Sequence, residues 1–372
     1  MNIEDIALTL TPGLGPKGAA RLLEVFFSAE KIFAASRAEL IHFAELNPKI
    51  ADAIVGRVAF PQAKMEMEYC RRKGITAIAS TDEQYPPLLR HTPDYPHVIY
   101  VMGNVAALKL RAVSIVGTRR LSSYGDRVCL NMVRNLGEKL SDLVVVSGLA
   151  LGVDGAAHRA AIHYDIPTIA VLPNALPAIT PTQHTALAAE IIERGGAIIS
   201  EFHSQTKQCR NLYHSRNRII AGLSGVTVVV ESPAAGGSMN TALTADGYER
   251  LVMAVPGRLT DVNSAGCNRL IATKVAQLYM SEDQLIREMM WDCDAPADRA
   301  VVVPLNSDFT PIQQSILNSF TSDDPLSIEE LCDRSGLGVS ELSVQLMELE
   351  LSGVMRMLPG NRYEILNVVV AK

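Results

Sequence analysis

Short apolar runs that alternate with helical patterns constrain the fold of this chain more than any other feature. Each run leads into a turn with Gly, Pro, Ser or Asn, and most are followed by a helical pattern. Such runs are typical of strands buried on both faces of a parallel sheet. They predict an α/β fold with a doubly wound, extended Rossmann-like parallel sheet, whose ligand site lies at the carboxyl ends of the strands. The runs are Val113–Val116, Leu143–Val146, Thr168–Leu172, Ala197–Ser200, Val226–Val230 and Val252–Val255.

The segment SIVGTRRLSSYG, which contains most of the first run, places two arginines at this edge of the sheet. Gly117 breaks the strand, and Ser122 and Ser123 are good N-cap residues for a following helix. The first turn of a helix attracts anions, and the guanidinium groups of Arg119 and Arg120 add bidentate donors for phosphate. We therefore expect a phosphate-bearing ligand at Gly117, Thr118, Arg119 and Arg120. The alternative is a plain strand-to-helix turn with solvated arginines.

A basic segment lies between Phe202 and Val230. It contains no acidic residue, although the whole chain carries a formal net charge of −6. Basic side chains beside an aromatic ring suit a nucleic-acid backbone with a base stacked on the ring. The ring here is Tyr213, and Asn217 supplies a polar amide. The basic residues of the segment are Lys207, Arg210, Arg216 and Arg218.

Two of these arginines have a second interpretation. The run RNRIIAGLS also begins an amphipathic helix pattern, so the sequence leaves open whether Arg216 and Arg218 pair within the fold. Lys207 and Arg210 lie where no apolar periodicity is present, and we expect both to face the ligand.

Seven motifs in fixed order resemble the DNA processing protein A family (DprA/Smf) across Tyr85–Ile286. The resemblance implies a protein that binds single-stranded DNA, protects incoming DNA, and loads a RecA-type recombinase onto it during natural transformation. The motifs are SIVGTRRLSSYG, VVVSGLALGVDGAAH, GGAIISEF, RNRIIAGLSGVTVVVE, GGSMNTALTA, VMAVPG and SAGCNRLI.

The resemblance also assigns roles to residues. The family's glycine-arginine loop falls on Gly117, Thr118 and Arg119, and its basic and aromatic residues fall on Arg210 and Tyr213. Tyr213 stands where phenylalanine is usual, and Thr118 replaces a frequent serine. Both replacements keep the chemistry, which is a stacking face and a small hydroxyl.

Further loops at the same edge are expected to complete a DNA site. We expect backbone amides at Gly148, Gly237 and Ser238 to hold phosphates. Each chain has one such pocket, so a long strand is held firmly only if pockets are joined, and we expect a homodimer. Duplex DNA should bind poorly because its bases are not available for stacking.

The composition changes towards both ends of the chain. Residues 1–70 contain LTPGLGPKGAARLLEVF, a Gly-Leu-Gly hairpin between helical patterns that predicts a helix-hairpin-helix or SAM-like helical domain. Lys17 and Arg21 are the cations near that hairpin, so we favour a structural or protein-contact role over DNA binding. Residues 71–292 are expected to form the Rossmann-like domain, and 293–309, with Pro and Asp, to form a linker.

Residues 310–372 predict a winged helix. Helical patterns near Pro311–Phe320, Ser327–Ser335 and Val339–Leu351 precede a hairpin pattern that ends near Leu366. The third pattern, VSELSVQLMELE, carries three glutamates and no lysine or arginine, which is the wrong charge for a groove lined by phosphates. A protein-binding or regulatory role is therefore expected for this domain.

Other classes of protein are disfavoured. No apolar run approaches the length of a membrane span and the first residues do not form a signal peptide, so we expect a cytoplasmic protein. The six cysteines have no C-x-x-C spacing, which favours reduced thiols over disulfides or zinc. We expect neither a metal ion nor a cofactor.

Catalysis is the remaining alternative. Asp154 and His158 are four residues apart and share a helix face, while Glu201 and Glu231 follow strands. No nucleophile elbow accompanies them, and the stretch AAGGSMNTALTA lacks the glutamate of nucleotide phosphoribohydrolases. We therefore expect a binding protein rather than an enzyme. A sensor that binds a small nucleotide in the same pocket stays open.

Overall fold

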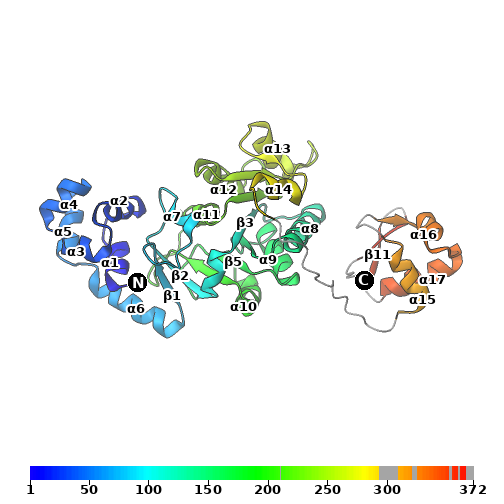
Figure 1. Ribbon diagram of the computed structural model, residues 1–372, viewed down its shortest axis with the longest axis horizontal. Helices are drawn as coiled ribbons and strands as arrows, with labels where there is room; N and C mark the ends of the chain where they lie inside the picture. Colours follow the sequence, from blue (N-terminus) through cyan, green and yellow to red (C-terminus); the bar gives the residue numbers. More distant parts are fainter. Residues whose placement is uncertain (210, 293–308, 321–324, 352–353, 359–360, 366–372) are drawn as a thin grey trace. The chain divides into compact units, whose positions relative to one another are not determined.

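The computed structural model describes residues 1–209, 211–292, 309–320, 325–351, 354–358 and 361–365. The chain divides into two compact units, residues 1–295 and residues 296–372. Figure 1 labels their helices and strands.

The first unit is built on a nine-stranded sheet in the described residues, with the order β1-β2-β6-β5-β4-β3-β7-β8-β9. From β6 to β9 every neighbouring pair is parallel. The chain starts this parallel part at β3, continues outward to β6, and returns to the other side of β3 with β7. The parallel strands are β3 (Arg111–Val116), β4 (Leu143–Ser147), β5 (Thr168–Val171), β6 (Ala197–Ser200), β7 (Val226–Val229), β8 (Leu251–Ala254) and β9 (Gln277–Leu278). The predicted doubly wound sheet is confirmed.

Two antiparallel strands, β1 (Thr76–Ala79) and β2 (Val98–Gly103), extend the sheet beyond β6. Around them lie the short helix α7 (Pro87–Arg90) and a 3-10 helix, η1 (Val105–Lys109). Open α/β sheets often carry antiparallel strands at one edge, because an antiparallel strand needs no crossover helix.

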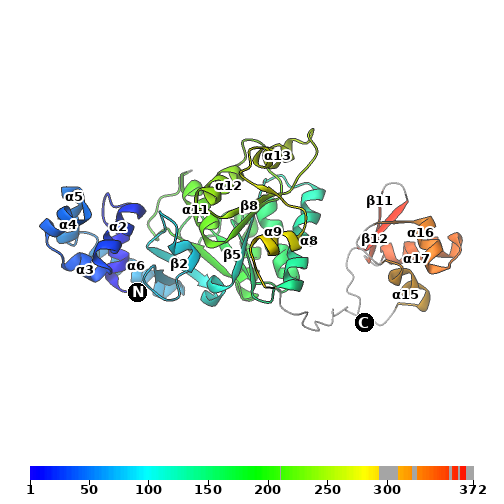
Figure 2. The same cartoon turned by 45° about the horizontal axis from the view of Figure 1, so that its top comes forward.

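Helices cover both faces of the sheet (Figures 1 and 2). One apolar core joins the sheet to α11 (Asn211–Leu223), α12 (Gly237–Gly247) and α13 (Ala265–Ala272). A second core, on the other face, contains α8 (Ser123–Lys139), α9 (Val153–His163) and α14 (Glu282–Glu288). The helix α10 (Thr185–Glu193) packs near β5 and β6 and follows the 3-10 helix η2 (Thr182–His184), and η3 (Val262–Ser264) precedes α13. Burial on both faces explains why the strands are continuous apolar runs.

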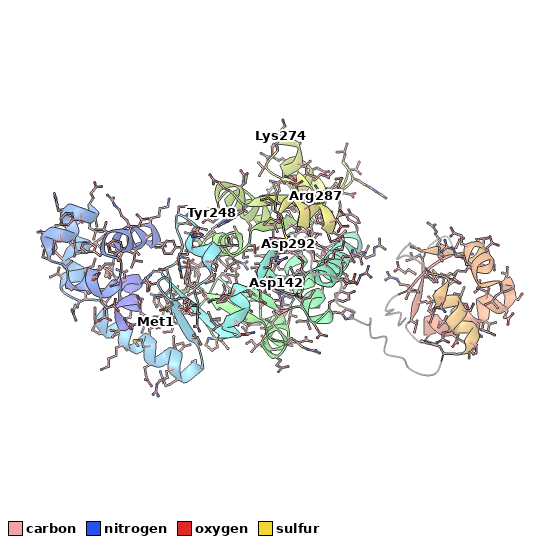
Figure 3. All side chains as sticks on the ribbon, in the orientation of Figure 1. Met1, Asp142, Tyr248, Lys274, Arg287 and Asp292 are labelled. Atoms are coloured by element: carbon pink, nitrogen blue, oxygen red, sulfur yellow. The ribbon has the colours of Figure 1, made fainter. Side chains whose placement is uncertain are left out.

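The amino end of β3 is closed by polar contacts. Arg111 forms an ion pair with the carboxylate of Asp142 at 3.2 Å and donates to the backbone oxygen of Asp292 at 2.9 Å. Its guanidinium lies 5.5 Å from the ring centre of Trp291. Asp142 and Asp292 lie close together in Figure 3. The carboxyl end of β3, where the arginine loop begins, is the end that remains for a ligand.

Six helices at the start of the chain share an apolar core of their own. The hairpin between the first two contains Gly13, whose φ of +80° suits glycine. His97 beside β2 joins this group to the sheet, because its Nε2 lies 3.0 Å from the buried carboxylate of Asp5. The predicted boundary at residue 70 falls inside the last of these helices. They are α1 (Ile3–Leu10), α2 (Pro16–Phe26), α3 (Ala29–Ala34), α4 (Arg37–Ala44), α5 (Pro48–Val55) and α6 (Phe60–Lys73).

The second unit has the element order of a winged helix. A three-stranded sheet, β10-β12-β11, packs with three helices around buried residues that include Leu331, Leu342 and Leu346. The predicted winged-helix order is confirmed, and most of the predicted linker, residues 293–308, lies outside the described residues. The elements are α15 (Pro311–Asn318), β10 (Leu326–Ser327), α16 (Ile328–Ser335), α17 (Val339–Leu351), β11 (Met355–Leu358) and β12 (Arg362–Ile365).

Across the described ranges, we find no helix with the length and apolar character that a membrane span requires.

Candidate nucleic-acid interface

The loop between β3 and α8 is fixed by its neighbours. The Thr118 amide donates to the backbone oxygen of Glu231 at 2.6 Å, and the Thr118 oxygen accepts from the Val153 amide at 3.1 Å. A Cβ at Gly117 would lie 2.4 Å from a Val153 methyl, so only glycine fits. The Thr118 amide is therefore not available to a phosphate, whereas the side chains of Arg119 and Arg120 are exposed.

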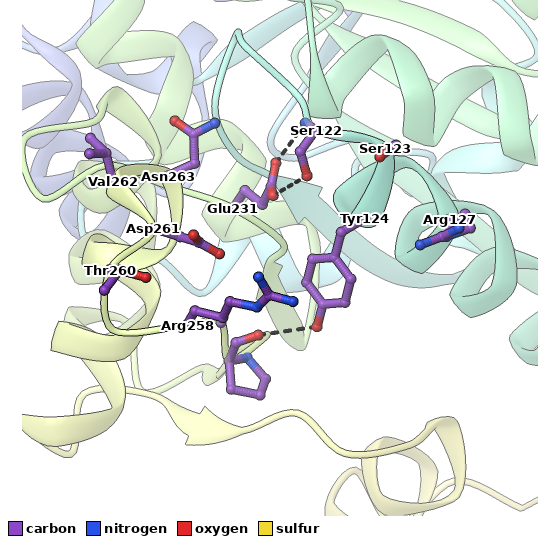
Figure 4. A pocket seen from close by; sticks show the side chains of 12 residues that line it. Ser122, Ser123, Tyr124, Arg127, Glu231, Arg258, Thr260, Asp261, Val262 and Asn263 are labelled. Carbon is purple, nitrogen blue, oxygen red and sulfur yellow. Dashed lines mark hydrogen bonds between the residues drawn. The ribbon is translucent and has the colours of Figure 1, made fainter. Parts of the chain in front are cut away.

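A carboxylate of the protein lies at the first turn of α8. Glu231, which follows β7 and is 3% exposed, accepts from the Ser122 amide at 3.0 Å and from the Ser122 hydroxyl at 2.5 Å (Figure 4). The positive end of the helix dipole thus already has an anion. The glutamate side chain takes both donors of the N-cap residue Ser122, which disfavours the expected phosphate contact at this helix start.

The side chains of Arg119 and Tyr213 meet at the carboxyl edge of the sheet. The Arg119 guanidinium carbon lies 5.8 Å from the centre of the Tyr213 ring, within the range of a cation–π contact. A hollow of about 240 Å³ adjoins the same ring and is lined by Pro173, Gln208, Cys209 and Tyr213. The two residues therefore present one guanidinium and one aromatic ring beside a space large enough for a planar base.

The start of α12 adjoins this pair through α11. The Asn217 side-chain amide approaches the Gly237 backbone oxygen at 3.5 Å. Gly237 is exposed, and a Cβ there would touch nothing within 4 Å. Ser238 is buried and its hydroxyl donates to the Ser232 hydroxyl at 2.8 Å. Asn217 and Gly237 therefore extend the surface around Tyr213. The hydroxyl of Ser238 instead makes a hydrogen bond within the protein.

Arg216 is a structural residue. Its buried guanidinium donates to the backbone oxygens of Gly148 and Val171, at the ends of β4 and β5. Burial lowers the pKa of Arg216, and the nearby carboxylate of Asp154 acts against that shift. The arginine therefore fastens α11, which carries Tyr213, to the centre of the sheet.

Gly148 belongs to the same buried cluster, and its bonds there disfavour the expected phosphate contact. The Gly148 amide donates to the Asp154 carboxylate at 3.2 Å, and its oxygen accepts from Arg216. A Cβ at this position would lie 1.7 Å from the Arg216 guanidinium. Glycine is needed here for close packing, and no backbone donor is left for a ligand.

Arg218 is also held by contacts within the fold. Its guanidinium pairs with the Glu201 carboxylate and donates to the backbone oxygen of Asp94, and the side chain is 12% exposed. Of the two alternatives that the sequence left open for Arg218, these contacts favour pairing within the fold, because an acid outside the basic segment neutralises its charge. Lys207, by contrast, is exposed, and Arg210 lies outside the described residues.

Asp154 and His158, the candidate catalytic pair, each bond to other partners. Asp154 accepts from the amides of Gly148 and Ala150, and His158 Nδ1 lies 2.7 Å from the Thr168 hydroxyl. Burial raises the pKa of Asp154 and, with nearby positive charges, lowers the pKa of His158 to about 3. Both side chains are buried and serve the fold, as Glu201 and Glu231 also do.

A larger hollow beside the arginine loop was not predicted. Its volume is about 970 Å³, and Arg258 and Asp261 come from the loop after β8, while Tyr124 and Glu231 form the opposite part of its lining (Figure 4). The Asn263 amide joins this loop to the backbone oxygen of Arg120 at 2.9 Å. Nothing in the sequence marks the loop after β8, because its polar residues belong to no basic run.

Comparisons with known proteins agree with this architecture. The family model of DNA recombination-mediator protein A matches residues 76–290, and that of the DprA winged helix domain matches 302–361. Protein Smf of Escherichia coli is 34% identical over 316 residues, which are 82% of this chain and 81% of that protein. DNA processing protein DprA of Bacillus subtilis is 34% identical over 225 residues, which are 60% and 75%.

Solved structures give the same result. The X-ray structure of DNA processing protein A from Streptococcus pneumoniae has a TM-score of 0.67 and 27% identity, and the match covers 77% of this chain and 98% of that one. The Helicobacter pylori protein, studied for its single-stranded DNA binding mode, has a TM-score of 0.52 and 28% identity, with coverage of 58% and 95%. Because one family model spans most of the first unit and a second matches the tail, the chain belongs to the DNA processing protein A (DprA/Smf) family.

Proposed function

We propose that this protein binds single-stranded DNA at the surface formed by Arg119 and Tyr213. The observation that carries the proposal is the contact of these two side chains beside the hollow lined by Pro173 and Gln208. The contact places a guanidinium, which can bind a phosphate, next to an aromatic ring, on which a base can stack. A flexible strand can turn a base onto a protein ring, whereas a duplex keeps its bases stacked internally. The Helicobacter pylori relative, with its single-stranded DNA binding mode, supports this ligand class.

The surroundings extend the surface for a strand. Lys207 and Arg120 are exposed, and both lie in segments that adjoin the pair along the chain. Asn217 and Gly237 border Tyr213 through the contact between α11 and α12. We assign phosphate contacts to Arg119, Arg120 and Lys207, together with Arg210, and base stacking to Tyr213. Thr118 and Gly117 act through the loop's shape rather than as direct ligands.

The binding site is proposed to serve recombination rather than catalysis. The three acids considered as catalytic candidates, Asp154, Glu201 and Glu231, each bond to a partner within the fold, which favours a structural role for them. We propose that the protein protects incoming single strands and loads a RecA-type recombinase onto them in natural transformation. A homodimer would join two such surfaces on one strand.

Fluorescence anisotropy with a labelled dT oligonucleotide tests the DNA proposal. The full chain should bind the single strand at least tenfold more tightly than a duplex of equal length, which is about 1.4 kcal/mol. Equal affinity for both would contradict the stacking role of Tyr213.

Recombinase loading requires a separate assay. Filament assembly of a RecA-type recombinase on coated single strands should be faster with the full chain present. A chain ending at residue 295, which is the end of the first compact unit, should keep DNA affinity. Loss of loading by this shorter chain would assign the recombinase contact to the winged helix, and unchanged loading would assign it to the first unit. No acceleration by the full chain would overturn the loading role.

A further inference from the structure

The start of α8 is the place where this fold would bind a terminal phosphate. A strand, a glycine turn and a helix N-terminus form a common anion site, because the first amides of the helix point outward. In this protein, a carboxylate of the chain lies before that turn, because the amide and hydroxyl of the N-cap residue Ser122 donate to Glu231 at 3.0 and 2.5 Å. The Ser122 hydroxyl in turn accepts from the Gly125 amide at 3.1 Å.

The fit around the Glu231 carboxylate is close. A Cβ at Gly125 would lie 2.7 Å from Glu231 Oε2, so the helix presents no side chain where the carboxylate lies. The backbone oxygen of Glu231 also accepts from the Thr118 amide at 2.6 Å. Glu231 therefore contacts both ends of the loop that carries Arg119. Its backbone oxygen bonds Thr118, and its side chain bonds Ser122.

The carboxylate faces a space that a ligand can enter. Glu231 contributes to the lining of the hollow of about 970 Å³, together with Tyr124 and Arg258 (Figure 4). A phosphate monoester that entered there would meet a negative carboxylate beside the first turn of the helix. Like charges at contact distance repel each other.

We propose that Glu231 is a specificity-determining residue that excludes terminal phosphates, and hence free mononucleotides, from the start of α8. The carboxylate occupies both donors of the N-cap residue Ser122 and places a negative charge beside the first turn of the helix. Recognition is then left to Arg119 and Tyr213, which suit the internal phosphodiester and the base of a strand. The choice of a strand over a mononucleotide rests on the proposed function, whereas the blocked phosphate site does not.

Binding of inorganic phosphate and of dTMP by variants of the full chain tests the proposal. Glu231→Ser and Glu231→Ala should bind inorganic phosphate at least tenfold more tightly than the wild type in isothermal titration, because the Ser122 donors become free. Glu231→Gln removes the charge but still fills the space, so it should gain much less. Asp261→Asn removes an exposed carboxylate from the same hollow and should gain nothing.

Thermal unfolding provides a second readout in case truncation of Glu231 weakens the fold. A bound anion stabilises only the folded state, so phosphate should raise the melting temperature of Glu231→Ser more than that of the wild type and of Asp261→Asn. A variant that is unfolded alone should refold when phosphate is added. Hydrogen exchange of the Ser122 and Gly125 amides should slow in phosphate for the same variants.

Several results would overturn the proposal. One is that Glu231→Ser and Glu231→Ala gain neither phosphate affinity nor stability in phosphate. Another is that Glu231→Gln or Asp261→Asn gains as much as they do. A third is that the wild type binds phosphate as tightly as the variants. Single-stranded DNA binding is measured in parallel on the wild type and on Arg119→Ala. If the wild type does not bind single strands, the proposed function is wrong. The phosphate measurements on the Glu231 variants then still decide whether Glu231 blocks a phosphate site.

Discussion

The Arg119 guanidinium lies 5.8 Å from the centre of the Tyr213 ring, so the arginine loop after β3 and the basic segment before β7 meet in one surface. Under the proposed function, the guanidinium would contact a phosphate and the ring would stack a base of the same nucleotide unit. The two residues should therefore contribute to DNA affinity together rather than as separate sites.

Removing the guanidinium tests the phosphate contact. Arg119→Ala should weaken binding of a dT oligonucleotide by about 1 to 3 kcal/mol, the usual scale for a charge-assisted contact. Its melting temperature should change little because the side chain is exposed. Arg269→Ala, on the exposed surface of α13, is the matched control and should keep wild-type affinity. Equal affinities for both variants would remove Arg119 from the site.

Salt dependence separates stacking from charge. Tyr213→Leu should lower affinity by about 1 to 3 kcal/mol at every salt concentration. Lys207→Ala should instead flatten the slope of log affinity against log salt, because fewer counterions are released; Arg210→Ala should do the same. Anisotropy titrations from about 50 to about 200 mM salt measure both effects. Identical slope changes in the tyrosine and lysine variants would refute this division of roles.

The buried arginine should control stability. Arg216→Met leaves the Asp154 carboxylate and two backbone oxygens without their cation, and should cost about 3 to 5 kcal/mol in the free energy of unfolding. Gly148→Ala should also destabilise, because its Cβ would overlap the guanidinium. Urea unfolding measures both. A loss below about 0.5 kcal/mol in Arg216→Met, typical of a surface substitution, would show that the cluster is not structural.

His158 should make the fold sensitive to acid. Its folded pKa is lowered to about 3 by burial and by the positive charges of His184, Arg159 and Arg216. The unfolded chain takes up a proton near pH 6.5 and the folded chain does not, so stability falls as the pH decreases between these values. From about pH 7.5 to about pH 5 the loss from this residue is about 2 kcal/mol.

The substitution His158→Gln should remove that part of the acid sensitivity, because glutamine can still bond the Thr168 hydroxyl but takes up no proton. His163→Gln, at the exposed end of the same helix, should keep the wild-type dependence. The test is the free energy of unfolding, measured for each protein at both pH values. An equal loss between the two pH values in the wild type and in His158→Gln would refute the assignment.

The parallel strands could be predicted because each is buried on both faces and so appears as an apolar run. β7 was expected at Val226–Val230 and spans Val226–Val229. β9, with two exposed residues, has no such signal. The gathering of Arg119 and Tyr213 at one edge also follows from the strand order, although their contact does not.

Ion pairs between distant segments could not be predicted. The basic segment contains no acid, so the sequence left open whether Arg218 has a partner, and the fold places Glu201 beside it. Gly148 looked like an open loop until Arg216 and Asp154 closed around it. Glu231 and Ser122 lie in separate motifs, and nothing local indicates that one caps the helix of the other. Charge in a sequence indicates a site only where no partner from another segment neutralises it.

Photo-crosslinking tests the central claim most directly. A single strand that carries 5-iodouracil crosslinks to an aromatic side chain against which the base stacks, and peptide mass spectrometry identifies the residue. We predict a crosslink at Tyr213 that is reduced in Arg119→Ala and absent when the same label lies within a duplex. Crosslinks confined to the helices of residues 1–73 or to the winged helix, with none at Tyr213, would contradict the proposed DNA site.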